Sequence, residues 1–148
     1  MKPENNTYPI LSVQTTYQCN MACANCYLGD MLNNPKFPDV DVKKFEDVIK
    51  RLPNKTHIRF IGAEPTLNEN LFDLIKITKK YNHRPNMLTN GLKLADEYYV
   101  KGLKESGMTW IGLSMNGGLD DEVYKRFDNG KYAKLKMRAL ENCIKNNL

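Results

Sequence analysis

The chain has 148 residues, enough for one domain with a hydrophobic core. Hydrophobic residues make up 41% and charged residues 26%, as in ordinary soluble globular proteins, and no run of 18 apolar residues predicts a transmembrane helix. The net charge of +5 comes from lysines spread along the chain, which favours a solvated surface over a nucleic-acid partner.

Strands and helices alternate in the predicted chain. Short β-rich runs predict strands at 10–16, 57–61, 86–88 and 109–115. Apolar residues at helical spacing predict helices at 42–52, 69–81, 96–106 and 131–146, with a short helical piece at 122–127. This order predicts an α/β fold with parallel strands and right-handed crossovers, in one domain over residues 1–148.

Three cysteines lie together after the first predicted strand. Cys19, Cys23 and Cys26 have the spacing CxxxCxxC. Thiolates this close on a loop are more often metal ligands than disulfide partners, and soft sulfurs suit an iron–sulfur cluster or zinc. Three ligands leave one metal position open. The clustered thiols also favour a reducing compartment, and the polar N-terminus is not a signal peptide, so we expect a cytoplasmic protein.

Unusual sequences also follow the other three predicted strands. They are Gly62-Ala-Glu-Pro65, Thr89-Asn-Gly91 and Ser114-Met-Asn-Gly-Gly118. The carboxyl ends of parallel strands share one edge of a sheet, where active sites are built. We therefore expect the cysteine loop and these three segments to surround one cleft. An ordinary turn is the alternative interpretation of each of the first two segments.

In this order and at this spacing, the four motifs resemble the radical S-adenosylmethionine (SAM) superfamily. The branch with peptide-modifying enzymes and the molybdenum-cofactor cyclase is the most similar. The resemblance implies part of a (β/α) TIM-type barrel, with about four of the usual six βα units. It also implies an enzyme in which a 4Fe-4S cluster reductively cleaves SAM to methionine and a 5′-deoxyadenosyl radical, which abstracts a substrate hydrogen.

The resemblance assigns roles to individual residues. Cys19, Cys23 and Cys26 would hold the cluster, and Tyr27 would cover it or contact adenine. The main chain of the segment after the second strand would receive the SAM ammonium. Its four residues, with alanine where the family usually has a second glycine, are Gly62, Ala63, Glu64 and Pro65.

The later motifs would complete the SAM pocket. Thr89 and Asn90 would lie near the ribose or carboxylate of SAM, and Ser114 and Asn116 would donate hydrogen bonds to the same groups. The family often has aspartate at the position of Asn116. Other side chains considered are two candidate partners for the SAM carboxylate (Arg126, Arg138), two expected core residues (Cys143, Trp110) and one histidine expected to be structural or exposed (His83).

Two questions stay open at this stage. A structural zinc site completed by Cys143, His57 or His83, in a non-catalytic module, is the alternative to the cluster. Four βα units would expose an unpaired edge and an apolar interior. The chain would then be the N-terminal part of a longer enzyme, a short form covered by a homodimer or partner chain, or an inactive remnant. Besides SAM, the expected partners are a substrate and an electron donor such as flavodoxin or ferredoxin.

Overall fold

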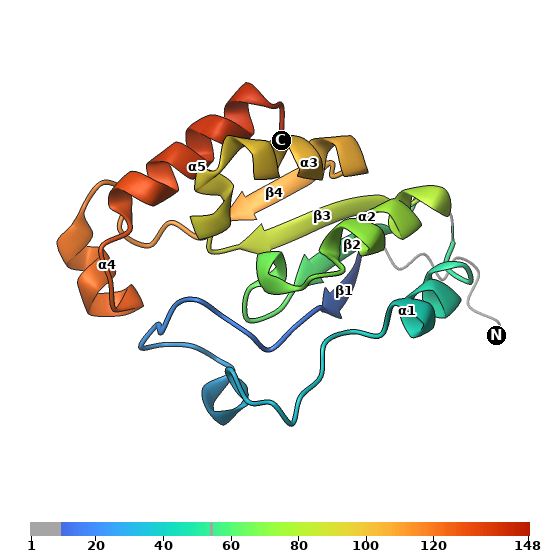
Figure 1. Ribbon diagram of the computed structural model, residues 1–148, viewed down its shortest axis with the longest axis horizontal. Coiled ribbons are helices and arrows are strands. Elements are labelled where there is room, and N and C mark those ends of the chain that lie inside the picture. The colour runs from blue at the N-terminus through green and yellow to red at the C-terminus, as the bar shows by residue number, and fades with distance from the viewer. Residues whose placement is uncertain (1–9, 54) are drawn as a thin grey trace, which may run out of the picture.

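The computed structural model describes residues 10–53 and 55–148. Strands and helices alternate from end to end (Figure 1). The strands are β1 (Ile10–Gln14), β2 (His57–Ile61), β3 (Arg84–Thr89) and β4 (Trp110–Leu113). The α-helices are α1 (Val42–Ile49), α2 (Leu71–Lys80), α3 (Glu97–Ser106), α4 (Asp121–Asp128) and α5 (Ala133–Lys145), with 3-10 turns at η1 (Gly29–Met31), η2 (Pro65–Leu67) and η3 (Leu92–Ala95).

The four strands form one parallel sheet in the order β1-β2-β3-β4. The pairing is in simple register, with Ile10 opposite His57 and His57 opposite Arg84. All four carboxyl ends therefore lie along one edge of the sheet, as the sequence predicts. The α/β fold with four parallel βα units is confirmed.

The helices bury one face of the sheet. In β2 the side chains of Ile58 and Phe60 are fully buried in the core, whereas His57, Arg59 and Ile61 alternate with them and stay partly exposed. Helices α1, α2 and α3 follow one another along the buried face, and α5 continues the layer beside α3 and η3 (Figure 1). The opposite face of the sheet is the inner face of the partial barrel, and most of its side chains are at least partly accessible.

The observed helices and strands differ from the predicted ones mainly at their ends. The strand predicted at 86–88 is longer and runs from 84 to 89, because Arg84 and Pro85 pair with β2. Asp41 caps the start of α1, where its Oδ1 accepts a hydrogen bond from Lys44 N at 2.7 Å. Helix α1 ends at 49 instead of 52, and the strands predicted to end at 16 and 115 end at 14 and 113.

One predicted core residue is exposed. Trp110 was expected in the core, but 49% of its surface is accessible because β4 is an edge strand and Trp110 lies on the inner face. Cys143 is buried in the core, as predicted. His83 is buried and structural, with its Nε2 3.0 Å from Ile49 O. Among the described helices, none is long and apolar enough to cross a bilayer.

Candidate functional site

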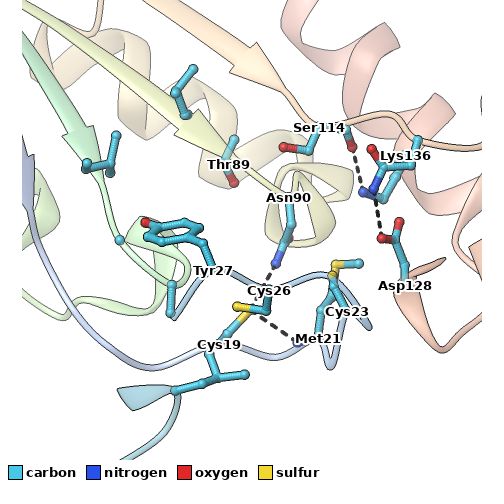
Figure 2. Close-up of a pocket in the computed structure, with 16 residues that line it drawn as sticks. Cys19, Met21, Cys23, Cys26, Tyr27, Thr89, Asn90, Ser114, Asp128 and Lys136 are labelled. Atoms are coloured by element: carbon cyan, nitrogen blue, oxygen red, sulfur yellow. Dashed lines mark hydrogen bonds between the residues drawn. The ribbon is translucent and has the colours of Figure 1, made fainter. Parts of the chain in front are cut away.

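A pocket of about 380 Å³ lies at the edge of the sheet where the strands end. This volume is in the range of small-molecule sites. The cysteine loop closes one side of the pocket, and residues after β2, β3 and β4 form the other (Figure 2). The lining residues are Cys19, Met21, Cys23, Cys26, Tyr27, Leu32, Ile61, Gly62, Ala63, Leu88, Thr89, Asn90, Ser114, Asn116, Asp128 and Lys136.

Hydrogen bonds fix the cysteine loop at both ends. The Cys19 N–H donates to Asn33 Oδ1 at 2.7 Å, and the Asn33 amide returns a bond to Cys19 O at 3.2 Å. On the other side, Ala24 N donates to Phe127 O at 2.8 Å, which ties the loop to α4. These bonds fix the loop along one side of the pocket. Its three thiols form no disulfide and are partly exposed.

The thiols fit a cluster better than a single ion. Within residues 10–53 and 55–148, no three Cys, His, Asp or Glu side chains gather closely enough to hold one metal ion. Thiolates of a 4Fe-4S cluster bind different iron atoms and need not converge on one point. Cys19 Sγ also accepts bonds from Met21 N at 3.4 Å and Asn90 Nδ2 at 3.8 Å. Such donors are typical of sulfurs that carry negative charge.

Without a metal, burial raises the pKa of the Cys19 thiol. Burial, followed by the neighbouring Asp128 carboxylate, raises the pKa of Cys23 to about 11. Both thiols are therefore protonated at neutral pH. A bound metal would displace these protons, so metal binding to this loop releases protons.

The side chains considered as a fourth zinc ligand lie elsewhere. Cys143 is in the core, and His57 and His83 are at the amino ends of β2 and β3, opposite the cysteine loop. None of them lines the pocket. A tetrahedral structural zinc site with any of these residues would need a different fold.

The segment after β2 crosses close to the chain that follows β1. Ala63 N donates to Thr16 O at 3.0 Å. A Cβ added to Gly62 would lie 2.7 Å from Thr16 O, so this approach requires glycine. Gly62 and Ala63 consequently present their main chain to the pocket, where the sequence predicts contact with an ammonium group.

Glu64 points away from the pocket into the protein. Its carboxylate is fully buried and accepts four hydrogen bonds, from Thr66 N (3.1 Å), Thr66 Oγ1 (2.7 Å), Thr89 Oγ1 (2.6 Å) and Asn90 N (2.7 Å). Neither Glu64 nor Pro65 lines the pocket. In this structure the carboxylate joins the loop after β2 to the end of β3, with three of the bonds on Oε1 and one on Oε2.

The last residue of β3, Thr89, and the first residue after it, Asn90, both line the pocket. Thr89 is buried and held by Glu64, whereas the Asn90 amide reaches across to the cysteine loop (Figure 2). There Asn90 Nδ2 donates to Asn20 Oδ1 at 2.8 Å as well as to Cys19 Sγ. Tyr27 lies at the mouth of the same pocket, with 73% of its surface accessible.

A buried lysine that the sequence analysis missed lines the pocket beside Ser114. Lys136 of α5 is 1% exposed, and its Nζ donates to Ser114 O at 2.6 Å (Figure 2). Its ammonium lies 5.3 Å from the centre of the Tyr124 ring. Burial lowers the pKa of Lys136, although the Asp128 carboxylate acts in the opposite direction.

Asp128, at the end of α4, is the second pocket residue that the sequence analysis missed. Asn116 Nδ2 donates to its Oδ1 at 2.8 Å, while Oδ2 has no partner among the described residues. Asp128 is fully buried, so this free oxygen is an unsatisfied acceptor beside the pocket. Asp128 therefore places a carboxylate beside the amide of Asn116.

The two arginines considered for anion binding do not line the pocket. Arg126 lies against the ring of Phe127, 5.6 Å from its centre, and Arg138 lines a different surface depression formed by α5 and its neighbours. Lys136 is the basic side chain that reaches the pocket. A sequence signal for it exists, because Lys136 interrupts the stripe that continues through Ala139 and Cys143.

Comparisons with known proteins agree with this geometry. The chain is 30% identical over 149 residues to 7,8-dihydro-6-hydroxymethylpterin dimethyltransferase of Methanocaldococcus jannaschii, covering 97% of this chain and 29% of that protein. It is 29% identical to GTP 3′,8-cyclase of Clostridium perfringens, covering 93% and 43%. The chain thus spans less than half the length of these relatives.

Two solved structures with a similar fold contain bound ligands. The native anSMEcpe structure with bound AdoMet and the Kp18Cys peptide aligns with a TM-score of 0.73 and 25% identity, over 94% of this chain and 41% of that one. Streptococcus suis SuiB with its precursor peptide SuiA shares the fold, with a TM-score of 0.69 and 16% identity, over 95% and 37%. The model of the Radical SAM superfamily matches residues 13–148. The chain belongs to the radical SAM superfamily, whose enzymes use a 4Fe-4S cluster and SAM.

Proposed function

We propose that this chain is the cofactor-binding part of an enzyme that cleaves SAM reductively. The observation that carries the proposal is the single pocket in which three free thiols face the loops after β2, β3 and β4. Together, the cluster and SAM would supply electron transfer and a 5′-deoxyadenosyl radical for hydrogen abstraction. The protein would position both groups and limit access of water.

Cys19, Cys23 and Cys26 would hold three irons of the cluster and leave the fourth open to SAM. Hydrogen bonds from Met21 N and Asn90 Nδ2 would stabilise the Cys19 thiolate. The main chain at Gly62 and Ala63 faces the pocket and would accept the SAM ammonium. In this assignment Glu64 and Pro65 shape the loop and do not touch SAM.

The remaining pocket residues would bind the rest of SAM. Thr89 and Asn90 would lie near its ribose or carboxylate, Ser114 and Asn116 would bond the same groups, and Tyr27 would cover the cluster or the adenine. Asn116 can use its free Oδ1 and second N–H, because only one amide hydrogen is directed at Asp128. The ammonium of Lys136 adds positive charge to this wall, which suits a carboxylate.

Such an enzyme would also need an electron donor and a substrate. The electron would come from a low-potential donor such as flavodoxin or ferredoxin, and the substrate would be a peptide or a cofactor precursor. A homodimer or partner chain could cover the exposed edge of β4. Residues 1–148 would act as one domain in the cytoplasm, where thiols stay reduced.

Anaerobic reconstitution tests the proposal. The protein is loaded with iron and sulfide, reduced with dithionite and mixed with SAM, and 5′-deoxyadenosine is measured by chromatography. We expect product from the wild-type protein and none from Cys23→Ala. Cys143→Ala is the matched control, because it removes a thiol outside the pocket, and it should retain both iron and product. Bound zinc without SAM cleavage would overturn the proposal.

A further inference from the structure

The inner face of the sheet carries cationic and aromatic side chains that SAM binding does not use. Arg59 lies on this face two residues before Ile61, and Asn86 lies two residues before Leu88. Ile61 and Leu88 line the SAM pocket. Two residues of a strand advance about 6.6 Å, so Arg59 and Asn86 form the layer directly below the pocket.

The positive charge of this layer has no counter-charge among the described residues. Arg59 and Arg84 lie on neighbouring strands, because Arg84 pairs with His57 and Asn86 pairs with Arg59. None of the four strands contains aspartate or glutamate, and neither arginine forms an ion pair with a described residue. The two arginines are diagonal neighbours on this face, a separation that long side chains can span, so both guanidinium groups can contact one anion.

Asn86 orients one of the guanidinium groups. Arg59 Nε donates to Asn86 Oδ1 at 3.3 Å, and Asn86 is only 3% exposed. With its Nε directed at Asn86, the guanidinium keeps its Nη hydrogens for a ligand. A guanidinium with free Nη hydrogens binds carboxylate and phosphate groups well.

An aromatic surface lies beside these charges. Trp110 pairs with Asn86 in the β3–β4 register and is half exposed. A Cβ added to Gly112 would lie 2.7 Å from Trp110 Cη2 and 2.7 Å from Leu88 Cδ2. The indole therefore leans over Gly112 towards Leu88 and the pocket, and glycine leaves the space for it. An exposed indole next to a bound anion suits a flat ring.

We propose that the inner face formed by Arg59, Arg84 and Trp110 binds the substrate, and that this substrate is a small molecule with a flat ring and an anionic group. The inference rests on the proposed function, since SAM in the neighbouring pocket would deliver the radical to this ligand. The anion would contact the two arginines and the ring would lie on Trp110. The anionic group can be a phosphate or a carboxylate.

Tryptophan fluorescence gives a direct readout, because Trp110 is the only tryptophan in the chain. The full chain is titrated with guanosine 5′-monophosphate and with orotate, each paired with its uncharged counterpart, guanosine or uracil. We expect quenching by at least one charged probe, with affinity about ten-fold above its counterpart. Guanosine 5′-monophosphate identifies a phosphate ligand, and orotate identifies a carboxylate ligand.

Charge-removing variants locate the binding site. Arg59→Gln and Arg84→Gln should each weaken the charged probe about ten-fold. Arg51→Gln, in the exposed turn after α1 and outside the sheet, is the matched control and should have no effect. Equal quenching by charged and uncharged probes, no quenching at all, or wild-type affinity in the Arg59 and Arg84 variants would each overturn the inference.

The two proposals fail separately, because the titration requires neither cluster nor SAM. Formation of 5′-deoxyadenosine without quenching would reject the substrate face and keep the proposed function. Quenching without SAM cleavage would do the opposite.

Discussion

The amide of Asn116 donates a hydrogen bond of 2.8 Å to the buried carboxylate of Asp128, so the end of β4 and the end of α4 form one wall of the pocket. Asp128 is fully buried and keeps one oxygen without a partner among the described residues. Asn116 therefore both lines the pocket and donates a hydrogen bond to one of the two oxygens of a buried carboxylate. These two functions can be separated experimentally.

Asn116→Ala should weaken SAM binding and lower stability while the cluster stays intact. The variant loses a ligand contact and leaves the Asp128 carboxylate without its donor. We expect SAM affinity to fall about ten-fold and unfolding free energy to fall by about 1–3 kcal/mol. Anaerobic calorimetry, iron analysis and urea unfolding measure the three quantities. Loss of the cluster in this variant would contradict the assignment of Asn116 to SAM.

Glu64→Gln should destabilise the protein strongly although Glu64 does not line the pocket. Four donors converge on the carboxylate, and an amide can accept at only one of its two terminal atoms. We expect a loss of about 2 kcal/mol or more in the free energy of unfolding. Glu69→Gln is the control, because Glu69 is exposed. Similar urea midpoints for both variants would show that the four bonds do not stabilise the fold.

The buried Lys136 predicts a pH-dependent difference in stability. Burial lowers its pKa below the 10.5 of an ordinary lysine, so the unfolded chain binds this proton more tightly than the folded one. Protonation at neutral pH therefore opposes folding, and the penalty disappears as pH rises through the folded pKa towards 10.5. The free energy of unfolding of Lys136→Met, relative to wild type, should fall between pH 7 and pH 10.

Urea unfolding at several pH values checks this prediction. Lys134→Met, on the exposed side of the same helix, should show a difference from wild type that is nearly independent of pH. A constant difference for Lys136→Met as well would mean that burial does not shift its titration.

Cys143 should resist alkylation in the folded, metal-free protein, whereas Cys26 in the cysteine loop should react. Cys143 is 4% exposed, and burial raises its pKa to about 11. Only the thiolate reacts with iodoacetamide, so both access and ionisation protect Cys143. Mass spectrometry after brief labelling measures modification at each site. Labelling of Cys143 as fast as Cys26 would contradict the core position of α5.

The sequence was informative where a residue type has a special local role. The cysteine spacing and the motifs after the strands indicate the pocket, because parallel strands bring their ends to one edge whatever the details of packing. Most of the residues predicted from these motifs do line the pocket. The direction of the Glu64 side chain could not be predicted, since it depends on donors from Thr89 and Asn90, which are distant in the chain.

Asp128 and Lys136 were missed for a similar reason. Both are charged residues of helices, and such residues are usually solvated. Their burial arises only when α4 and α5 fold back over the end of β4, next to Ser114 and Asn116. Trp110 shows the opposite error: its apolar side chain suggested the core, but its place on an edge strand and on the inner face leaves it exposed.

The hydrogen bond from Ala24 N to Phe127 O has a consequence for how the protein is made. The cysteine loop is synthesised early, and the residues that close the pocket opposite it follow more than one hundred positions later. A growing chain therefore has an incomplete pocket wall opposite its three thiols until α4 and α5 have emerged and supplied Asp128 and Lys136.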